Sequence, residues 1–277
     1  DTTVVEVRTT LELRCDERFL RVHAEIDNTA RDHRLRAHFP LPAPVAGSDA
    51  ECAFTVVHRG LTAEGGPSEH GLPTFVSRRF VDCSDGERGL ALLHDGLLEY
   101  EVITDDAAPG PRGRELALTL LRATGYLSRL EIALRPDPAG PPMPVEGPQL
   151  HGHHVVDYAV LPHRGAWHDA DVHGAADDFL VGLERGRVRG GPGADLEPDG
   201  CHLSVVGAEI SAVLREGGAL VVRAHNPLPD ASTLRITRDG APVAGDVIDL
   251  RGQPTEAFTG ELALRPDQIA TVRLSSD

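Results

Sequence analysis

The sequence predicts an all-β protein in which a large antiparallel β-sandwich is followed by a small one. First, apolar and polar residues alternate with a period of two in many short stretches. Second, 29 Gly and 21 Pro, together 50 of the 277 residues, fall between these stretches. Third, only residues 175–183 have a convincing helical pattern. Short alternating stretches separated by turn residues are typical of antiparallel strands and not of βαβ units.

The strands of the first module follow from this alternation. Residues 5–15 alternate apolar and polar side chains, so this strand is expected to bury one face and leave the other in water. Residues 19–27 repeat the pattern, and turn signals at residues 84–86 and 94–96 separate later neighbours. The other expected strands are residues 53–58, 75–82, 89–93, 98–103, 115–122 and 153–161.

A second module is expected after residues 185–200, a polar segment rich in Gly and Pro that indicates a linker. The alternation then restarts in seven short strands. These are residues 201–206, 209–214, 219–226, 233–237, 246–250, 261–264 and 269–274. The modules are therefore placed at 1–190 and 200–277.

Composition excludes several function classes. The 27 basic residues are all Arg and are outnumbered by 43 acidic ones, so the net charge is 27 − 43 = −16. This balance argues against partners that are nucleic acids or anionic membrane surfaces. No apolar run approaches the roughly 18–20 residues of a membrane span.

The cysteines indicate the redox compartment. Cys15, Cys52, Cys83 and Cys201 form no CxxC pair, which argues against a zinc ribbon. Their wide spacing favours reduced, mostly buried thiols and a cytoplasmic, bacterial-type protein. Because Met143 is the only Met, the chain is expected to be processed or part of a longer protein.

Common catalytic motifs are absent from the sequence: no GxGxxG follows a strand, and there is no GxxxxGK[ST], HExxH or GxSxG. Two histidine clusters have metal-type ligands. In the first, His151 and His153 would share one strand face, with His154 and Asp157 beside them. The second spans residues 163–173 and has no ligand spacing of a known site. In both clusters we favour polar or hydrogen-bonded histidines over a metal site.

A third cluster offers directed hydrogen-bond donors. Arg122, Tyr126 and Arg129 surround the end of an expected strand, where such residues can bind a sugar or a carboxylate. The alternative is an ordinary surface turn.

The sequences of several segments resemble the C-terminal β-region of glycoside hydrolase family 38 α-mannosidases. The segments occur in the family's order and cover most of the chain. They are residues 28–40, 80–91, 118–129, 147–167, 222–227 and 264–272.

The resemblance implies a galactose mutarotase-like supersandwich followed by a small β-sandwich. It also implies a parent enzyme that hydrolyses terminal α-mannosides with retention. In the family, the zinc ligands, the nucleophilic Asp and the acid/base Asp precede the β-region. No catalytic or metal residue is therefore expected in this chain, which alone should be inactive, and zinc is expected in the missing catalytic domain.

Within the family, the β-region packs on its own N-terminal catalytic domain and helps to wall the active-site cleft, and one of its loops can offer an Arg to the sugar. Arg122, Tyr126 and Arg129 are the local candidates for substrate proximity. The family's β-region usually begins before the segment that resembles residues 3–13, so the first module is expected to be incomplete at its start. The expected partners are the catalytic domain, a mannoside and a second copy of the chain, while linkage and aglycone stay open.

Two other functions remain as alternatives. A stand-alone carbohydrate-binding sandwich would need exposed aromatic platforms, yet aromatic residues make up only 4% of the chain. A mutarotase-like enzyme would use His153 or His163 with a carboxylate as acid and base.

Overall fold

A computed structural model describes residues 2–96, 98–105, 112–132, 134–135, 137–186 and 200–275. The chain divides into two compact units, Asp1–Cys52 with Val57–Gly182, and Ala53–Val56 with Leu183–Asp277. Residues 187–199 of the expected linker lie outside the described residues, so the boundaries at 190 and 200 stay a prediction. The all-β fold class is confirmed: the strand pairs described below are antiparallel, and the described chain has one short α-helix.

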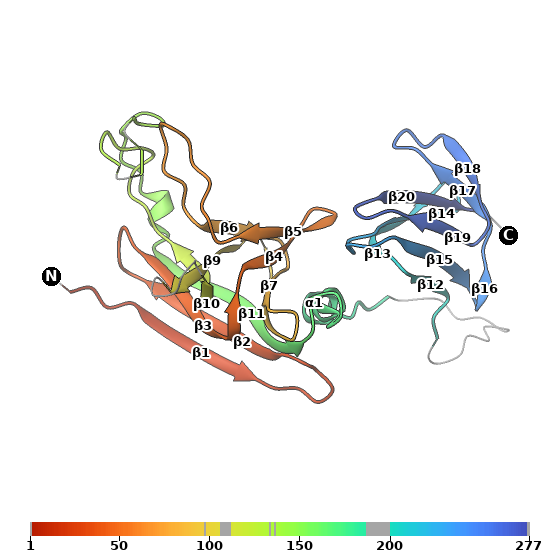
Figure 1. Cartoon of the computed structure of the whole chain (residues 1–277), viewed down its shortest axis with the longest axis horizontal. Helices are drawn as coiled ribbons and strands as arrows, with labels where there is room; N and C mark the ends of the chain where they lie inside the picture. The colour runs from red at the N-terminus through yellow and green to blue at the C-terminus, as the bar shows by residue number, and fades with distance from the viewer. Residues whose placement is uncertain are drawn as a thin grey trace. The chain divides into compact units, whose positions relative to one another are not determined.

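Two sheets form the first unit (Figure 1). In spatial order, the seven-stranded sheet contains β1 (Glu6–Glu12), β2 (Leu20–Asn28), β11 (Gly152–Arg164), β8 (Arg88–His94), β7 (Phe80–Ser84), β4 (Gly47–Cys52) and β5 (Thr55–Gly60). The four-stranded sheet contains β3 (Arg34–Val45), β10 (Arg112–Arg122), β9 (Leu98–Asp105) and β6 (Thr74–Ser77).

The core of this unit lies where side chains of both sheets meet. Leu92 of β8 and Leu118 of β10 are fully buried there. Tyr100 of β9 is also fully buried, and its hydroxyl lies 3.1 Å from the Ser48 hydroxyl, which satisfies the polar end of the ring. The period-two pattern therefore positions these strands as the sequence predicts.

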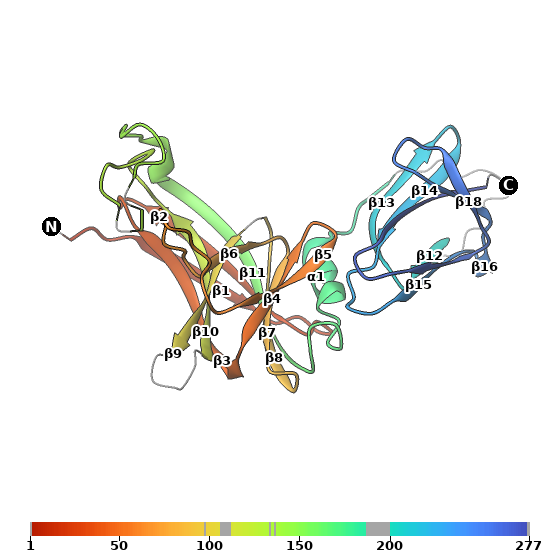
Figure 2. The same cartoon turned by 45° about the horizontal axis from the view of Figure 1, so that its top comes forward.

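The opposite face of β7 and β8 carries the helix α1 (Val172–Leu180), seen beside these strands in Figure 2. Asp171 caps the helix by accepting a hydrogen bond from the Gly174 amide. Arg79 holds the helix by contacting Asp177 while it donates to the buried carboxylate of Glu51 at 2.6–2.8 Å. The expected helix at residues 175–183 thus exists but begins three residues earlier.

The expected burial of the first strand is wrong. All seven residues of β1 are exposed, including those on its apolar face. β1 lies at the edge of its sheet, next to β2, and in the described chain no element covers it. Alternation therefore predicted the strand correctly, but it could not show whether a partner covers the apolar face.

Strand β3, which contains Pro40, Pro42 and Pro44, is absent from the sequence prediction. It is an edge strand that pairs only with β10 among the described strands. Prolines two residues apart all turn the same edge of a strand, so these three can face the unpaired side without breaking the ladder with β10.

The single strand expected at residues 75–82 is also wrong, because the chain changes sheets there. β6 ends at Ser77 in one sheet and β7 begins at Phe80 in the other. Arg79, in the break between them, is held by Glu51, and this ion pair fixes the crossing point.

The second unit has its own apolar core and two sheets. One sheet has β12 (Leu203–Val206), β15 (Ser232–Arg238) and β16 (Ala241–Pro242) in order, with β19 (Glu261–Leu264) also paired to β15. The other has β13 (Glu209–Glu216), β14 (Ala219–His225), β20 (Ile269–Leu274), β17 (Gly245–Ile248) and β18 (Pro254–Phe258). Buried Asn226 ends β14, where its side-chain amide donates to the carbonyls of Asp230 and Leu264. These bonds stabilise the chain where β14 ends.

All four cysteines are free, but the expectation of mostly buried thiols is wrong. Cys83 is buried and Cys52 partly buried, whereas Cys15 and Cys201 are exposed. No helix among the described residues has the length and apolar character to cross a membrane.

His94 gives the fold a pH dependence that can be measured. Burial lowers its pKa to about 4, and its ring is already satisfied by Ser77 at 2.6 Å and the Gly96 carbonyl at 3.0 Å. The unfolded state binds this proton below about pH 6.5 and the folded state does not, so stability falls as the pH drops from 6.5 to 4, by about 3 kcal/mol in total.

We expect His94→Gln to remove this slope. Urea unfolding of both proteins between pH 4.5 and 7.5 measures the difference, which should approach about 1.4 kcal/mol per pH unit near pH 5. Parallel curves for the two proteins would contradict the assignment to His94.

Candidate functional site

The candidate residues Arg122, Tyr126 and Arg129 lie at the end of β10 and in the loop after it. The Arg129 guanidinium carbon is 4.5 Å from the centre of the Tyr126 ring, a cation–π contact. Arg122 instead donates to Glu99 at 3.2 Å, and its side chain is 68% exposed. The structure thus brings Tyr126 and Arg129 together, and directs Arg122 toward a carboxylate of the adjacent strand.

A polar cluster, made of buried Asn28 and Gln149 with the more exposed Asp32, anchors this loop. Asp32 accepts hydrogen bonds from the Gly125 amide at 2.6 Å and from Gln149 Nε2 at 3.2 Å. Its own amide donates to Gln149 Oε1 at 2.9 Å. Asn28 donates to the carbonyls of Gln149 and Leu150 at 2.9 and 2.8 Å. The loop therefore begins and ends on this one hydrogen-bonded polar cluster, which limits its motion.

Space is limited around Gly125 at the start of the loop. A Cβ at this position would collide with Gln149 Nε2 and lie 3.0 Å from Asp32 Oδ1. The packed start of the loop therefore sets the positions of Tyr126 and Arg129, which follow Gly125 in the chain. The loop, drawn in yellow-green, extends beyond the sheets in Figures 1 and 2.

Beside the loop, the outer face of the four-stranded sheet carries linked acids and arginines. Arg34 lies 3.0 Å from Glu99 and 3.4 Å from Glu101. Burial raises the pKa of Glu99, but hydrogen bonds from Thr119 and Arg34 outweigh it and hold that pKa below its ordinary value. Glu99 is therefore an ionised acceptor that holds Arg122 near the loop.

The histidines of the first cluster are spread along β11 instead of converging. His153 pairs with Asp27 of β2 at 2.9 Å, and His154 Nε2 contacts the Leu150 carbonyl at 2.7 Å. His151 lies just before β11 and is exposed. In the described part of the chain, no three His, Cys, Asp or Glu residues form a possible metal-ion site.

The second histidine cluster lies partly in the interior. His163 Nε2 contacts Asp82 at 2.7 Å, and both side chains are buried. Burial raises the pKa of Asp82, and although burial also disfavours the His163 cation, the Asp82 contact raises the pKa of His163. His173 and Trp167 pack against Phe80. These groups stabilise the loop before α1 and the helix itself.

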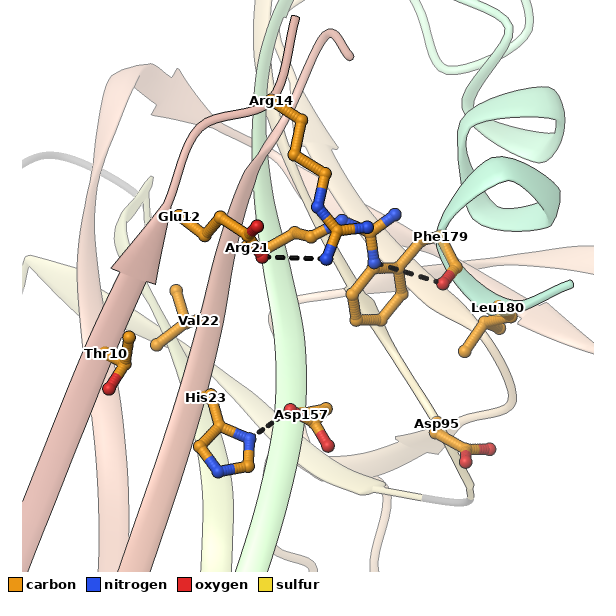
Figure 3. A pocket seen from close by; sticks show the side chains of 10 residues that line it. All are labelled: Thr10, Glu12, Arg14, Arg21, Val22, His23, Asp95, Asp157, Phe179 and Leu180. Carbon is orange, nitrogen blue, oxygen red and sulfur yellow. Dashed lines mark hydrogen bonds and ion pairs between the residues drawn. The ribbon is translucent and has the colours of Figure 1, made fainter. Parts of the chain in front are cut away.

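A pocket of about 540 Å³ lies on the outer face of the seven-stranded sheet (Figure 3). His23 of β2 and Asp157 of β11 face each other in it, with His23 Nδ1 2.7 Å from Asp157. The hydrogen bond to Asp157 raises the pKa of His23. Phe179 of α1 forms one wall, and its carbonyl accepts from Arg21. The complete lining is Thr10, Glu12, Arg14, Arg21, Val22, His23, Asp95, Asp157, Phe179 and Leu180.

The pocket can bind a small polar ligand through paired donors and acceptors. Sequence analysis noted Asp157 but missed its partner His23, because the two are 134 positions apart. It also gave no role to Asp32 and Gln149, although both lie in segments that carry the family resemblance. Their joint function depends on strand pairing, which local sequence patterns do not show.

Comparisons with known proteins give the same family. No family model matches the chain. A Halalkalibacterium halodurans protein with the provisional name mannosylglycerate hydrolase is 32% identical over 181 residues, or 65% of this chain and 18% of that protein.

Two crystal structures from Enterococcus faecalis share the fold over 98% of this chain, each at 22% identity. One is a protein in glycosyl hydrolase family 38, with TM-score 0.75 and 30% of its chain covered. The other, from strain V583, is an alpha-mannosidase, with TM-score 0.76 and 29% covered. The resemblance to family 38 is thus confirmed, and the chain spans between 18% and 30% of the length of these proteins.

The role of the polar cluster of Asn28, Asp32 and Gln149 in anchoring the loop can be tested by substitution. We expect Gln149→Ala to lower the free energy of unfolding by about 1–3 kcal/mol, because it removes the side-chain partners of the Asp32 amide and of the Asp32 carboxylate. Amide hydrogen exchange at Gly125 and Val145, at the ends of the loop, should accelerate.

The matched control is Glu146→Ala, which removes an exposed ion pair with Arg31 from the same loop. It should change stability by less than about 1 kcal/mol. Equal amide exchange rates at Gly125 and Val145 in the two variants would show that the polar cluster does not hold the loop.

Proposed function

We propose that this chain is the β-sandwich region of a retaining α-mannosidase of glycoside hydrolase family 38, and that the whole protein hydrolyses terminal α-mannosides. The observation that carries the proposal is the fold. It matches an alpha-mannosidase structure over 98% of this chain, while covering only 29% of that protein. Such a proportion is what a non-catalytic region of a longer enzyme would give.

The catalytic groups are proposed to lie in the preceding part of the whole protein. Retaining hydrolysis needs a nucleophilic carboxylate and an acid/base carboxylate about 5–5.5 Å apart. Zinc would belong with that catalytic part, as it does in the family that the sequence resembles. This chain would pack on the catalytic part in a cytoplasmic enzyme and be inactive by itself.

The substrate class follows from the relatives. One carries the name of a hydrolase of mannosylglycerate, and another is an alpha-mannosidase. We therefore propose α-mannosides with a small or anionic aglycone, glycerate among them, as the first substrates to test.

The loop that follows β10 is proposed to approach the sugar. Guanidinium groups donate directed hydrogen bonds to hydroxyl and carboxylate oxygens, and Arg122 and Arg129 are both available in this region. The Tyr126 ring, which is 41% exposed, supports the Arg129 side chain. The anchored loop would keep these donors in place before the substrate binds, which lowers the entropy cost of recognition.

The alternatives have less support. Trp167 is only 7% exposed, so it cannot be a stacking platform for a stand-alone carbohydrate-binding module. His163 is buried against Asp82, which does not suit a mutarotase acid or base that must reach a sugar. His153 is exposed and paired with Asp27, and the pocket that it lines has a volume of only about 50 Å³, too small for a sugar.

The test is hydrolysis of an aryl α-mannoside and of mannosylglycerate by the whole protein encoded by the gene. We expect zinc-dependent hydrolysis, with the α-anomer of mannose as the first product by NMR. The 277-residue chain alone should give no rate above background. An initial β-anomer, or no activity on any α-mannoside by the folded, zinc-loaded protein, would contradict the proposal.

The same assay tests the loop with single substitutions. Arg122→Ala or Arg129→Ala should reduce kcat/KM at least about ten-fold, since one charged hydrogen bond contributes 1.5–3 kcal/mol. Arg135→Ala is the control. Arg135 lies farther along the same loop, but its guanidinium is paired with Glu69, which lies before β6. Wild-type kcat/KM in both loop variants would exclude the loop from substrate binding.

A further inference from the structure

A pocket of about 260 Å³ lies on the outer face of the five-stranded sheet in the second unit. Val222 and Ala224 of β14 belong to the apolar core, so Val221 and Arg223, which alternate with them, point to the opposite face. Val221 is only 2% exposed although it lies on this outer face, and Ile248 beside it in the pocket is 8% exposed. The pocket therefore has a small apolar floor that is shielded from water.

The turn between β17 and β18 forms one wall of this pocket. The Asp249 carboxylate accepts hydrogen bonds from the backbone amides of Arg251 and Gln253, both at 2.8 Å, and so fixes the shape of the turn. The Arg273 guanidinium donates to the Gly252 carbonyl at 3.0 Å, which ties the turn to β20. Because these bonds use only the backbone of Arg251, its exposed side chain is available to a ligand.

Two arginines line the pocket, Arg223 and Arg251, and neither forms an ion pair with a carboxylate in the part of the chain that the structure describes. Acidic residues outnumber basic ones by 43 to 27, so a shortage of acids does not explain this. Half-buried Arg223 donates through Nε to the hydroxyl of buried Thr271 at 3.3 Å, which leaves its two terminal nitrogens for another acceptor. A guanidinium that is partly removed from water is stabilised by an anion that accepts two parallel hydrogen bonds. The pocket therefore favours an anionic ligand.

Two acids also line the pocket, and they narrow the class of anion. Asp249 is held by the two backbone amides of its turn, whereas Glu216, at the end of β13, is exposed. A carboxylate in the wall of a pocket repels a bare anion but accepts a hydrogen bond from a hydroxyl group. A ligand with a carboxylate for the arginines and a hydroxyl for Glu216 satisfies both charges, and its carbon atoms can contact Val221.

We propose that this pocket binds a small hydroxylated carboxylate, an acid of the size of glycerate. Its carboxylate lies between Arg223 and Arg251, its hydroxyl donates to Glu216, and its carbon atoms contact Val221 on the floor. Only the choice of glycerate as the probe rests on the proposed function, in which glycerate is an aglycone to be tested. Binding to the pocket requires no hydrolysis, so the two proposals can fail separately.

The test is isothermal titration of the 277-residue chain with three probes at low ionic strength, where charges are least screened. Glycerate should bind saturably, with one molecule per chain. Glycerol lacks the carboxylate and propionate lacks the hydroxyl groups. Each should bind at least about ten-fold more weakly than glycerate, because each loses a hydrogen bond in which one partner is charged.

Single substitutions locate the bound glycerate. Arg251→Ala should weaken its binding at least about ten-fold, and it should leave thermal unfolding unchanged because the side chain is exposed. Arg215→Ala is the matched control: Arg215 is also exposed, but it lies opposite Leu220, which packs against the core, and so points away from the pocket face. In the unmodified chain, glycerate should shift the NMR signals of the Gly252 and Thr271 amides.

Four results would each overturn the proposal. The first is the absence of saturable glycerate binding. The second is equally tight binding of glycerol or propionate, which would show that the pocket does not read both groups of the ligand. The third is unchanged glycerate binding in Arg251→Ala. The fourth is an equal loss of binding in Arg215→Ala, which would attribute the effect to overall charge and not to the pocket.

Discussion

The seven-stranded sheet of the first unit is wider than the four-stranded sheet that packs on it, and this mismatch governs the rest of the unit. Where the sheets overlap, side chains such as Leu92 and Leu118 form a continuous core. Beyond the overlap, each strand needs another cover or stays exposed. Strands β7 and β8 gain a second cover from α1, so almost all their residues are buried, while nothing in the described chain covers β1, whose residues are all exposed.

The cover over β7 and β8 depends on a buried charge. Glu51 is 1% exposed, and an ionised carboxylate at such depth needs a closely bound partner. Arg79 supplies it and also contacts Asp177 of α1, so one guanidinium connects the sheet to the helix. The same Arg lies where the chain crosses between sheets. Removal of either charge would affect the helix and the crossing together.

The local pattern of apolar and polar residues predicted most strands of both units, because burial of one strand face makes the two residue types alternate along the sequence. It failed where burial depends on distant parts of the chain. Leu11 alternates as a core residue but nothing in the described chain lies over it, and Pro40 looks incompatible with a strand until its edge position is known. Likewise, Tyr126 and Arg129 are close enough in sequence to be grouped in advance. Asp32 and Gln149, 117 positions apart, required the fold to reveal that they anchor the loop.

The proposed role in a mannosidase rests on one geometric idea: a rigid β-region holds Arg122, Tyr126 and Arg129 at the border of an active site supplied by the rest of the protein. The most direct measurement is a crystal structure of the whole protein with a mannoside bound. The account predicts a guanidinium nitrogen of Arg122 or Arg129 within hydrogen-bond distance, about 3 Å, of a sugar or aglycone oxygen. A sugar bound with the loop in bulk solvent, remote from every substrate atom, would contradict it.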